Sequence, residues 1–314
     1  MRPIGNALAC PDCRSPIVDD TCESCGRAFP TVDGVRSMLP KRVREDTRAF
    51  FEDDDEPRYG RTRMPPEIAQ SVGTFLDSLP RDALVVELGS GRCLFAGDHP
   101  NLVLSDYSIH ALRRFGRGER LQLDAQALPF RDESVDAFFS IATIEHVPRP
   151  ELVMAEIDRC LAHGGAALLY PAWFVFPWAS RDLAHRPYRE LGLRDRLEKA
   201  LIPLRSHRVH RFLTALPRRL ARELQLALNR QVPFTYRRLA PNLAQYQTSD
   251  SDAFTSMDPH ACATFFLSRG CDVPGAATRA QRLLLRYVPI EVRKPKIASH
   301  QRARTDATAS RPRR

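Results

Sequence analysis

Four cysteines near the N-terminus are the first residues whose type and spacing could do chemistry. They form two C-x-x-C pairs separated by eight residues: Cys10, Cys13, Cys22 and Cys25. Each turn of this kind directs two thiolates toward one point, and two turns complete the tetrahedral sulfur shell that Zn²⁺ prefers. Four thiolates leave no open coordination position, so the pattern predicts a structural zinc and favours it over redox cysteines. A unit this small needs the metal because its apolar core is too small to hold it folded.

A second set of candidate residues lies where three predicted strands end. Glycines that follow a buried strand let the backbone turn and approach a ligand closely. An acidic residue at the end of the next strand can accept both hydroxyls of a ribose. Asp106 has this place, 19 residues after Glu87, and Asp124 at the end of the third strand could meet an adenine amino group. The candidate ligand-binding residues are Glu87, Gly89, Ser90, Gly91, Asp106 and Asp124.

Strands that alternate with helices must position these residues. Short apolar runs predict strands, and apolar residues at helical spacing predict helices between them, which together indicate a mostly parallel, doubly wound α/β sheet. The predicted strands are 83–87, 102–106, 121–124, 135–141, 166–170 and 282–292. The predicted helices are 65–79, 108–115, 150–161, ending at Gly164-Gly165, and 259–269.

Residues 83–170 resemble the cofactor domain of class I S-adenosylmethionine-dependent methyltransferases, of the type that acts on small molecules or glycans. The motifs that carry the resemblance are Val-Val-Glu-Leu-Gly-Ser-Gly at 85–91, Leu-Ser-Asp-Tyr-Ser at 104–108, Leu-Asp-Ala-Gln-Ala-Leu-Pro-Phe at 123–130, Ile-Glu-His-Val at 144–147 and Gly164-Gly165. The resemblance implies a seven-stranded Rossmann-like sheet and S-adenosylmethionine as cofactor. It also implies that Glu87, Gly89 and Gly91 shape the methionine pocket, that Asp106 holds the ribose and that Asp124 faces the adenine.

The resemblance divides the chain into four parts. Residues 1–40 resemble the zinc ribbon fused to some of these enzymes, and 41–66 form a polar linker. Residues 67–292 form the methyltransferase domain, with a basic helical insertion at about 174–245. Residues 293–314 have no apolar periodicity and are expected to be a disordered basic tail.

Two departures from the family pattern lie in the loop after the first strand. Cys93 stands where a third glycine is usual, and only 12 residues separate Glu87 from Pro100, so the following helix must be short. Both changes could loosen the methionine pocket. A non-catalytic binding protein that keeps the fold is therefore an alternative to the enzyme.

Methyl transfer to an acceptor that must lose a proton needs a general base. His146, which follows the fourth strand, is the candidate base, and Glu145 is an equal candidate for this role. Alternatively, the histidine only shapes the pocket. Asp250 and Asp252 could also approach an acceptor, or belong to a polar loop. Tyr170 and Trp173 could line the acceptor pocket or belong to the core.

Composition limits the class of protein and its partners. The 314 residues are 43% hydrophobic and 27% charged, which indicates a globular chain with a sizeable core. No apolar run has the length of a transmembrane helix and no signal peptide is evident, so a cytoplasmic protein is expected, either free or peripheral at a membrane. The net charge of +9 is uneven, because residues 174–240 contain 15 Arg and Lys against 5 Asp and Glu.

Three interpretations of this basic insertion remain open. It could be a helical lid over the acceptor site, a surface that contacts anionic lipid, or an RNA-binding surface. Leu216, Leu220, Leu224 and Leu228 predict one apolar helix face. Arg218, Arg219 and Arg222 are expected to contact the anionic partner. The expected acceptor is an O or N atom, or with less support a C atom, of a small molecule, a glycan or a lipid-linked precursor. The alternative acceptor is rRNA or tRNA.

Overall fold

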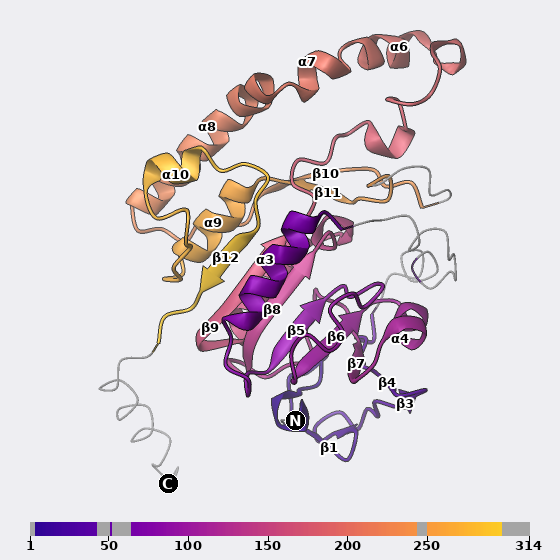
Figure 1. Ribbon diagram of the computed structural model, residues 1–314, viewed down its shortest axis with the longest axis vertical. Coiled ribbons are helices and arrows are strands. Elements are labelled where there is room, and N and C mark those ends of the chain that lie inside the picture. Colours follow the sequence, from indigo (N-terminus) through magenta and orange to yellow (C-terminus); the bar gives the residue numbers. More distant parts are fainter. Residues whose placement is uncertain (1–3, 43–50, 52–63, 244–249, 297–314) are drawn as a thin grey trace.

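The computed structural model describes residues 4–42, 51, 64–243 and 250–296. Its centre is an eight-stranded sheet in the order β12-β9-β8-β5-β6-β7-β4-β3 (Figure 1). Neighbouring strands from β4 to β9 are parallel, while β3 and β12 pair antiparallel at the two edges. The strands are β3 Thr31–Val32, β4 Val35–Ser37, β5 Val85–Leu88, β6 Leu102–Asp106, β7 Glu119–Gln122, β8 Val135–Ile141, β9 Leu161–Tyr170 and β12 Ile290–Arg293.

Helices cover both faces of this sheet, which confirms the predicted doubly wound α/β class. On one face, α3 (Pro66–Asp77) packs Val72, Phe75 and Leu76 against strand residues of β5, β6 and β8. On the other face, α5 (Pro150–Cys160) and α9 (Pro259–Leu267) contribute to a larger core. Helix α4 (Ile109–Phe115) begins at Ser108, whose hydroxyl accepts a hydrogen bond from the Ala111 N–H.

The order of the strands creates a crevice at the centre of the sheet. The chain runs outward from β5 through β6 to β7, and then returns to place β8 and β9 on the other side of β5. Ligands of doubly wound sheets bind at such a switch point, beyond the carboxyl ends of the strands. The ends of β5, β6 and β8 therefore define the place where a cofactor site is expected.

The predicted elements are largely confirmed, with three corrections. Gly164-Gly165 lie inside β9 rather than at a helix end, because Gly164 takes a φ of +83° and donates its N–H to the Lys294 carbonyl. Residues 91–101 form turns with no helix, so the shortened connection lacks even the short helix expected there. The final strand is only β12, since Arg279–Leu283 form helix α10, capped by Thr278 and Gln281.

The N-terminal segment packs against the sheet rather than standing apart from it. A short 3₁₀ helix (Ile4–Ala7) and the hairpin of β1 (Ile17–Val18) and β2 (Thr21–Cys22) precede β3 and β4. Strand β4 pairs parallel with β7, so the N-terminal hairpin of β3 and β4 extends the main sheet. The linker expected at 41–66 and the tail expected at 293–314 lie mostly outside the described residues.

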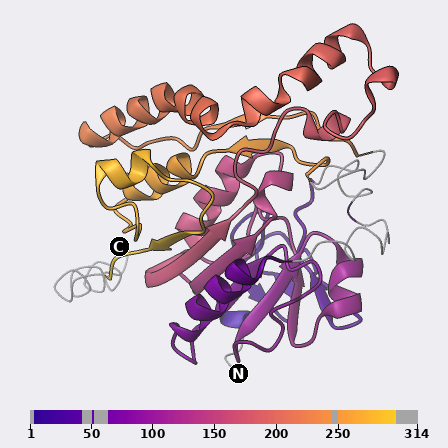
Figure 2. The ribbon, with the colours of Figure 1, turned by 45° about the horizontal axis from the view of Figure 1, so that its top comes forward.

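The basic insertion follows β9 and is helical over much of its length. Its helices α6 (Leu193–Ala200), α7 (Ile202–Ser206) and α8 (Arg208–Ala227) follow one another along the outer edge of the molecule (Figures 1 and 2). The chain then returns through β10 (Tyr236–Arg238), which pairs with β11 (Thr255–Met257). Among the described helices, none combines the length and the apolarity needed to cross a bilayer.

Candidate functional site

A cavity of about 530 Å³ lies at the switch point of the sheet. Its wall includes all six ligand-binding residues expected from the sequence: Glu87, Gly89, Ser90, Gly91, Asp106 and Asp124. The candidate base His146 also lines it, whereas Glu145 is fully buried behind the wall. The carboxyl ends of β5, β6, β7 and β8 thus bring these residues together, although Glu87 and His146 lie 59 positions apart in the sequence.

The turn after β5 depends on two glycines with positive φ. Gly89 has a φ of +78°, and a Cβ atom there would lie 2.2 Å from the Thr143 side chain. The Thr143 hydroxyl donates a hydrogen bond to the Gly89 carbonyl at 3.3 Å. The N–H groups of Gly89 and Ser90 both donate to the Ser105 carbonyl, which ties the turn to β6. A side chain at position 89 cannot be accommodated without displacing Thr143.

Asp106 is held by backbone N–H groups on both sides. Its Oδ2 accepts the Gly91 N–H and its Oδ1 accepts the Ser108 N–H, each at 2.8 Å. Burial raises the pKa of Asp106, although these backbone hydrogen bonds oppose the change. Each carboxylate oxygen can accept a further hydrogen bond, so the group retains acceptor capacity toward the cavity.

Glu87 carries a buried carboxyl group with one unsatisfied oxygen. Burial is the main cause that raises its pKa to about 8; a hydrogen bond with Ser90 opposes this change, and the nearby carboxylates of Asp106 and Asp98 add to it. Among the described residues, none forms a hydrogen bond with Glu87 Oε2. An unpaired buried carboxyl group on a cavity wall fits a ligand that carries positive charge.

Asp124 lines the cavity, and Cys93 lies in the loop that follows β5. Asp124 Oδ1 accepts hydrogen bonds from the Gln126 N–H at 2.9 Å and from Gln126 Nε2 at 3.0 Å, and burial raises its pKa. Cys93, at the position of the third glycine, takes a φ of +54°. Its thiol is buried, which raises its pKa to about 12 and makes it a poor nucleophile.

The candidate base faces two carboxylates. His146 Nδ1 lies 3.3 Å from Asp252 Oδ2, and His146 Nε2 lies 3.8 Å from Glu145 Oε1. Burial disfavours the imidazolium, but Asp252, Glu145 and Asp250 together raise the pKa of His146 above its usual value. Burial also raises the pKa of Glu145 to about 7. The arrangement can hold and release a proton near neutral pH.

Asp252 reaches His146 because the chain before β11 packs against the turn that carries the histidine. The Phe254 N–H donates to the Glu145 carbonyl at 2.9 Å, and the Thr255 hydroxyl donates to the same oxygen. Of the two aromatic residues considered for the acceptor pocket, Tyr170 lines the cavity, while Trp173 is buried in the core. Met64, Thr143 and Tyr287 also line the cavity and were not expected from the sequence.

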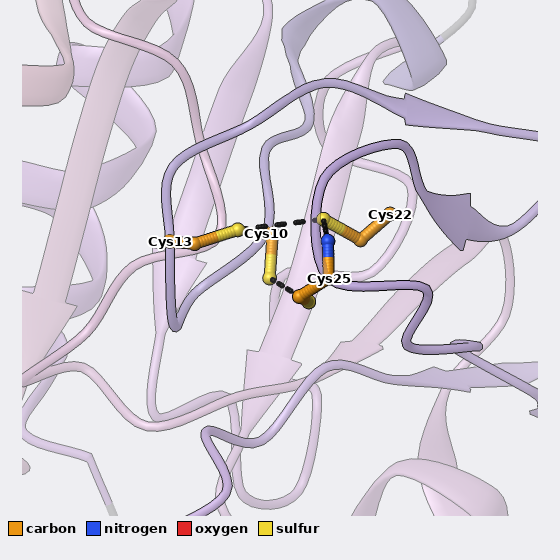
Figure 3. A group of neighbouring side chains, drawn as sticks. All are labelled: Cys10, Cys13, Cys22 and Cys25. Carbon is orange, nitrogen blue, oxygen red and sulfur yellow. Dashed lines mark hydrogen bonds between the residues drawn. The ribbon is translucent and has the colours of Figure 1, made fainter.

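The four N-terminal cysteines converge as their spacing predicts (Figure 3). Cys10 Sγ lies 3.8 Å from Cys25 Sγ, and Cys13 Sγ lies 3.4 Å from Cys22 Sγ. A tetrahedral zinc with Zn–S bonds of about 2.3 Å would separate its sulfur ligands by about 3.8 Å, close to these distances. Hydrogen bonds with Ser15 lower the pKa of Cys13 to about 6, whereas burial raises that of Cys10 to about 12.

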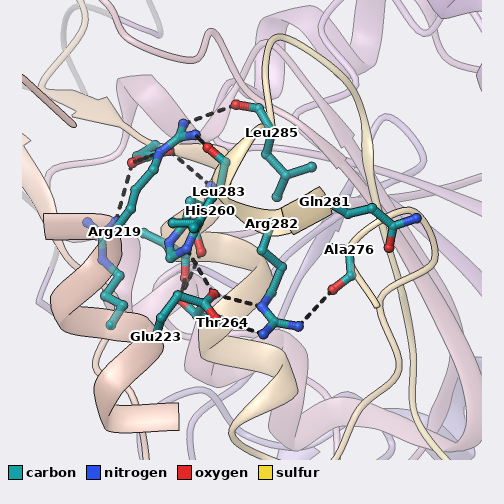
Figure 4. Close-up of polar contacts among 12 residues, drawn as sticks. Arg219, Glu223, His260, Thr264, Ala276, Gln281, Arg282, Leu283 and Leu285 are labelled. Carbon is teal, nitrogen blue, oxygen red and sulfur yellow. Dashed lines mark hydrogen bonds and ion pairs between the residues drawn. The ribbon is translucent and has the colours of Figure 1, made fainter. Parts of the chain in front are cut away.

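The expected anion-binding role of Arg219 and Arg222 is wrong. Both guanidinium groups are buried and pair with Asp258: Arg219 Nη2 lies 2.7 Å from Oδ1, and Arg222 Nη1 lies 3.3 Å from Oδ2. Arg219 also donates to the carbonyls of Leu283 and Leu285 (Figure 4). Only Arg218 of the expected three is exposed. A count of charges along the chain could not reveal this, because the partner lies 36 to 39 residues away.

Comparisons with known proteins agree with the geometry of the cavity. Residues 86–169 match the model of a family described as "Methyltransferase domain". A tRNA (carboxymethyluridine(34)-5-O)-methyltransferase of Xenopus tropicalis is 33% identical over 125 residues, covering 38% of this chain and 20% of the relative. The enzyme of the same name from Arabidopsis thaliana is 30% identical over 122 residues, covering 36% of this chain and 29% of the relative.

A further relative and two solved structures overlap with shorter parts of the chain. An uncharacterized methyltransferase of Mycobacterium marinum is 44% identical over 74 residues, covering 23% of this chain and 29% of the relative. The YcgJ protein of Bacillus subtilis superposes with a TM-score of 0.31 at 19% identity, covering 34% of this chain and 52% of that one. A SAM-dependent methyltransferase of Thermotoga maritima has a TM-score of 0.26 at 29% identity, covering 32% and 47%.

The matched region coincides with the strands that build the cavity. It begins one residue before Glu87 and ends within β9, so it includes the turn after β5, Asp106, Asp124 and His146. The chain spans about a fifth to three tenths of the length of the curated relatives compared above. Residues 86–169 are therefore similar in sequence to a methyltransferase domain.

Proposed function

We propose that this chain binds S-adenosylmethionine in the cavity at the switch point and transfers its methyl group to an acceptor. The observation that carries the proposal is the convergence of Glu87, Gly89, Gly91, Asp106 and Asp124 on one cavity of about 530 Å³. These residues come from the ends of three parallel strands within the matched methyltransferase domain. The activity of the whole chain rests on this convergence rather than on overall similarity to any relative.

The residues present fit the cofactor in three respects. Asp106 has acceptor capacity for the ribose hydroxyls, and Asp124 has it for the adenine amino group. Gly89 and Gly91 both line the cavity and take positive φ values, so the turn lets backbone lie close to the methionine part of the cofactor. Glu87 offers an unsatisfied carboxyl oxygen to a ligand that carries both a sulfonium and an ammonium group.

The protein's part in the chemistry is chiefly alignment. The bound cofactor supplies an activated methyl group, so an acceptor held in line with it needs little further assistance. Where the acceptor must lose a proton, His146 is the proposed base, since it lines the cavity and its pKa is raised. Asp252 is proposed to hold the imidazole in position and to stabilise its protonated form.

The acceptor we favour is an O or N atom of a small molecule, a glycan or a lipid-linked precursor. The cavity wall that includes His146 also includes Tyr170 and Tyr287, which suit a small acceptor that approaches over aromatic surface. A tRNA acceptor is the second candidate, because the relatives from Xenopus tropicalis and Arabidopsis thaliana are named as tRNA methyltransferases. We also propose that Cys10, Cys13, Cys22 and Cys25 bind one structural zinc.

Asp106→Ala tests the cofactor assignment. Losing the proposed carboxylate–ribose contact is expected to cost about 1–3 kcal/mol, which corresponds to roughly a 5- to 150-fold loss of affinity for S-adenosylmethionine. Calorimetry with purified protein measures this affinity. Asp77→Asn is a suitable control because that carboxylate is exposed and does not line the cavity. Unchanged binding in Asp106→Ala would contradict the site assignment.

The acceptor class can then be tested with the same protein. Radiolabelled methyl transfer into small-molecule, lipid and RNA fractions of a cell extract distinguishes the two candidates. Label found in the RNA fraction alone would identify tRNA or another RNA as the acceptor and exclude the favoured small-molecule, glycan or lipid-linked acceptor. Cofactor binding without transfer to any fraction would favour the non-catalytic alternative.

A further inference from the structure

Helix α8 turns three of its charged residues toward the protein and most of its large apolar residues outward. Arg219, Arg222 and Glu223 are buried, with only 3–6% of their surface exposed. Arg219 and Arg222 pair with Asp258. Glu223 pairs with His260 and Arg282 (Figure 4). The outward residues are Val209, Phe212, Leu213, Leu220, Leu224 and Leu228, which we call the leucine stripe, and Leu224 is 61% exposed.

This orientation is the reverse of what a surface helix normally shows. An amphipathic helix in a globular protein turns its apolar face to the core because burial of that face stabilises the fold. Here a network of buried ion pairs holds the opposite face inward. The leucine stripe is therefore left largely exposed, with 37–61% of each side chain accessible. Exposed apolar residues gathered on one helix face mark a candidate interaction site.

The helices before α8 extend the same kind of surface. Leu193, Leu197, Leu201 and Leu204 recur every three or four residues along α6 and α7, and all four are exposed. The three helices run consecutively along one outer edge of the molecule, away from the central sheet (Figures 1 and 2). Exposed apolar residues thus continue over most of the insertion from 193 to 228.

The charges beside the stripe identify its partner. From residue 202 to 230 the only acidic residue is Glu223, which is buried, while Arg208, Arg218 and Arg230 are exposed. A surface that combines leucines with unopposed arginines matches a bilayer of anionic lipids, where acyl chains receive the leucines and headgroups the arginines. RNA would leave the leucines without a partner, and a second copy of this helix would bring like charges together.

We propose that the face formed by α6–α8 binds the surface of an anionic lipid bilayer, with α8 lying in the plane of the interface. A helix of 20 residues would lie along about 30 Å of that surface. The helix also borders the candidate active site, because Arg211 Nη1 hydrogen-bonds the Tyr287 hydroxyl at 2.7 Å and Tyr287 lines the cavity. Binding in this way would present the cavity close to the lipid headgroups.

Co-sedimentation of the full chain with vesicles tests the proposal without cofactor or turnover, so its failure would leave the proposed methyl transfer untouched. Vesicles of phosphatidylcholine with about one third phosphatidylglycerol are compared with pure phosphatidylcholine at low and high salt. The wild-type chain is expected to bind the anionic vesicles at least tenfold more tightly, with binding that weakens as salt screens the charges. Equal binding to both vesicles, or to neither, would overturn the proposal.

Two sets of variants separate the leucine stripe from simple charge attraction. Leu213→Gln, Leu220→Gln and Leu224→Gln together keep every charge, including the basic residues after Arg293, and are expected to weaken binding at least tenfold. Val18→Gln with Val32→Gln, two exposed apolar residues of the N-terminal segment, is the matched control and is expected to bind as wild type. Arg208→Gln with Arg218→Gln is expected to weaken binding about fivefold per arginine.

The same variants distinguish the lipid bilayer from other possible partners of the leucine stripe. If the leucine triple variant binds vesicles as wild type does, the stripe is not the membrane contact and the proposal fails. It also fails if light scattering shows a wild-type dimer that the leucine variant loses, since a second copy would then cover the stripe. Tight RNA binding that depends on the arginines, together with weak vesicle binding, would identify RNA as the partner instead.

Discussion

Glu87 shows how one buried carboxyl group can prepare a cavity for a charged ligand. Its Oε2 lacks a hydrogen-bond partner among the described residues, and burial keeps its pKa near 8, so the group is largely protonated in the free protein at neutral pH. A cationic ligand would favour the ionised form and lower that pKa. Binding would then release a proton, and affinity would rise with pH up to about 8.

The Glu87→Gln variant tests this account through stability. In the free wild-type protein, the folded state retains a proton between pH 4.5 and about 8 that the unfolded state has lost. Stability therefore falls as pH rises through that window. We expect Glu87→Gln to match wild type in Tm near pH 5, to exceed it near pH 8.5, and to bind S-adenosylmethionine more weakly. Asp77→Asn, an exposed change away from the cavity, should retain the wild-type slope; a Gln variant with that slope would contradict the burial argument.

The residues around the cavity differ in how far the sequence could predict them. Glu87, Asp106 and Asp124 were predictable because each lies at or within two residues of the carboxyl end of a strand, and neighbouring parallel strands bring these ends together. Tyr287 was not predictable as a cavity residue, because it lies in the loop just before β12, and the sequence pattern predicted a strand for this loop. The role of Asp252 as the partner of His146 depends on how β11 packs against residues 144–146, which local sequence does not encode.

At the scale of elements, α8 shows why charge counts mislead. Its leucine spacing was sufficient to predict the helix, and the arginines between the leucines suggested an exposed basic face. The structure instead buries two of these arginines against Asp258, which also caps α9 by accepting the His260 N–H at 3.0 Å. The direction in which a helix faces is decided by distant partners, and here those partners are charged.

Asp258→Asn tests whether these ion pairs hold α8 in place. The change leaves two buried guanidinium groups without a charged partner, which typically costs about 3–5 kcal/mol. The two tryptophans, Trp173 and Trp178, are buried where the insertion begins, so their fluorescence in urea reports its release. Arg218→Gln, on the exposed side of the same helix, should change stability by less than about 0.5 kcal/mol. Equal effects of the two changes would mean that the network is not what orients the helix.

At the scale of the whole molecule, the N-terminal cysteine unit and the cofactor domain form one connected structure. Strand β4 extends the central sheet beside β7, and the Met38 N–H donates to the Gln122 carbonyl at 2.8 Å. Arg14, next to the second cysteine, donates to the Leu128 carbonyl and to Glu156 at 2.8 Å each. The sequence predicted a separate small domain because the cysteine spacing is local, whereas the strand pairing that joins it to the sheet spans some 85 residues.

This connection implies that zinc at the cysteines supports the cofactor site. The Ser37 hydroxyl donates to Gln122 Oε1 at 2.7 Å, and Gln122 Nε2 donates to the Tyr107 carbonyl beside Asp106, at 3.1 Å. Loss of the metal should loosen β4, and through Gln122 the end of β6 that positions Asp106. We therefore expect Cys13→Ser with Cys25→Ser to reduce zinc content from about one equivalent to near zero and to lower both Tm and cofactor affinity.

The Ser37→Ala variant separates the metal from the path that transmits its effect. It removes the hydroxyl that contacts Gln122 but leaves all four cysteines intact, so zinc content should remain near one equivalent while cofactor affinity falls by a smaller factor. Metal analysis and calorimetry on the same preparations measure both quantities. If the cysteine variant loses zinc and still binds S-adenosylmethionine with wild-type affinity, the N-terminal unit is joined to the sheet without supporting its site. A metal-free wild-type protein with full stability would show that the cysteines do not hold zinc at all.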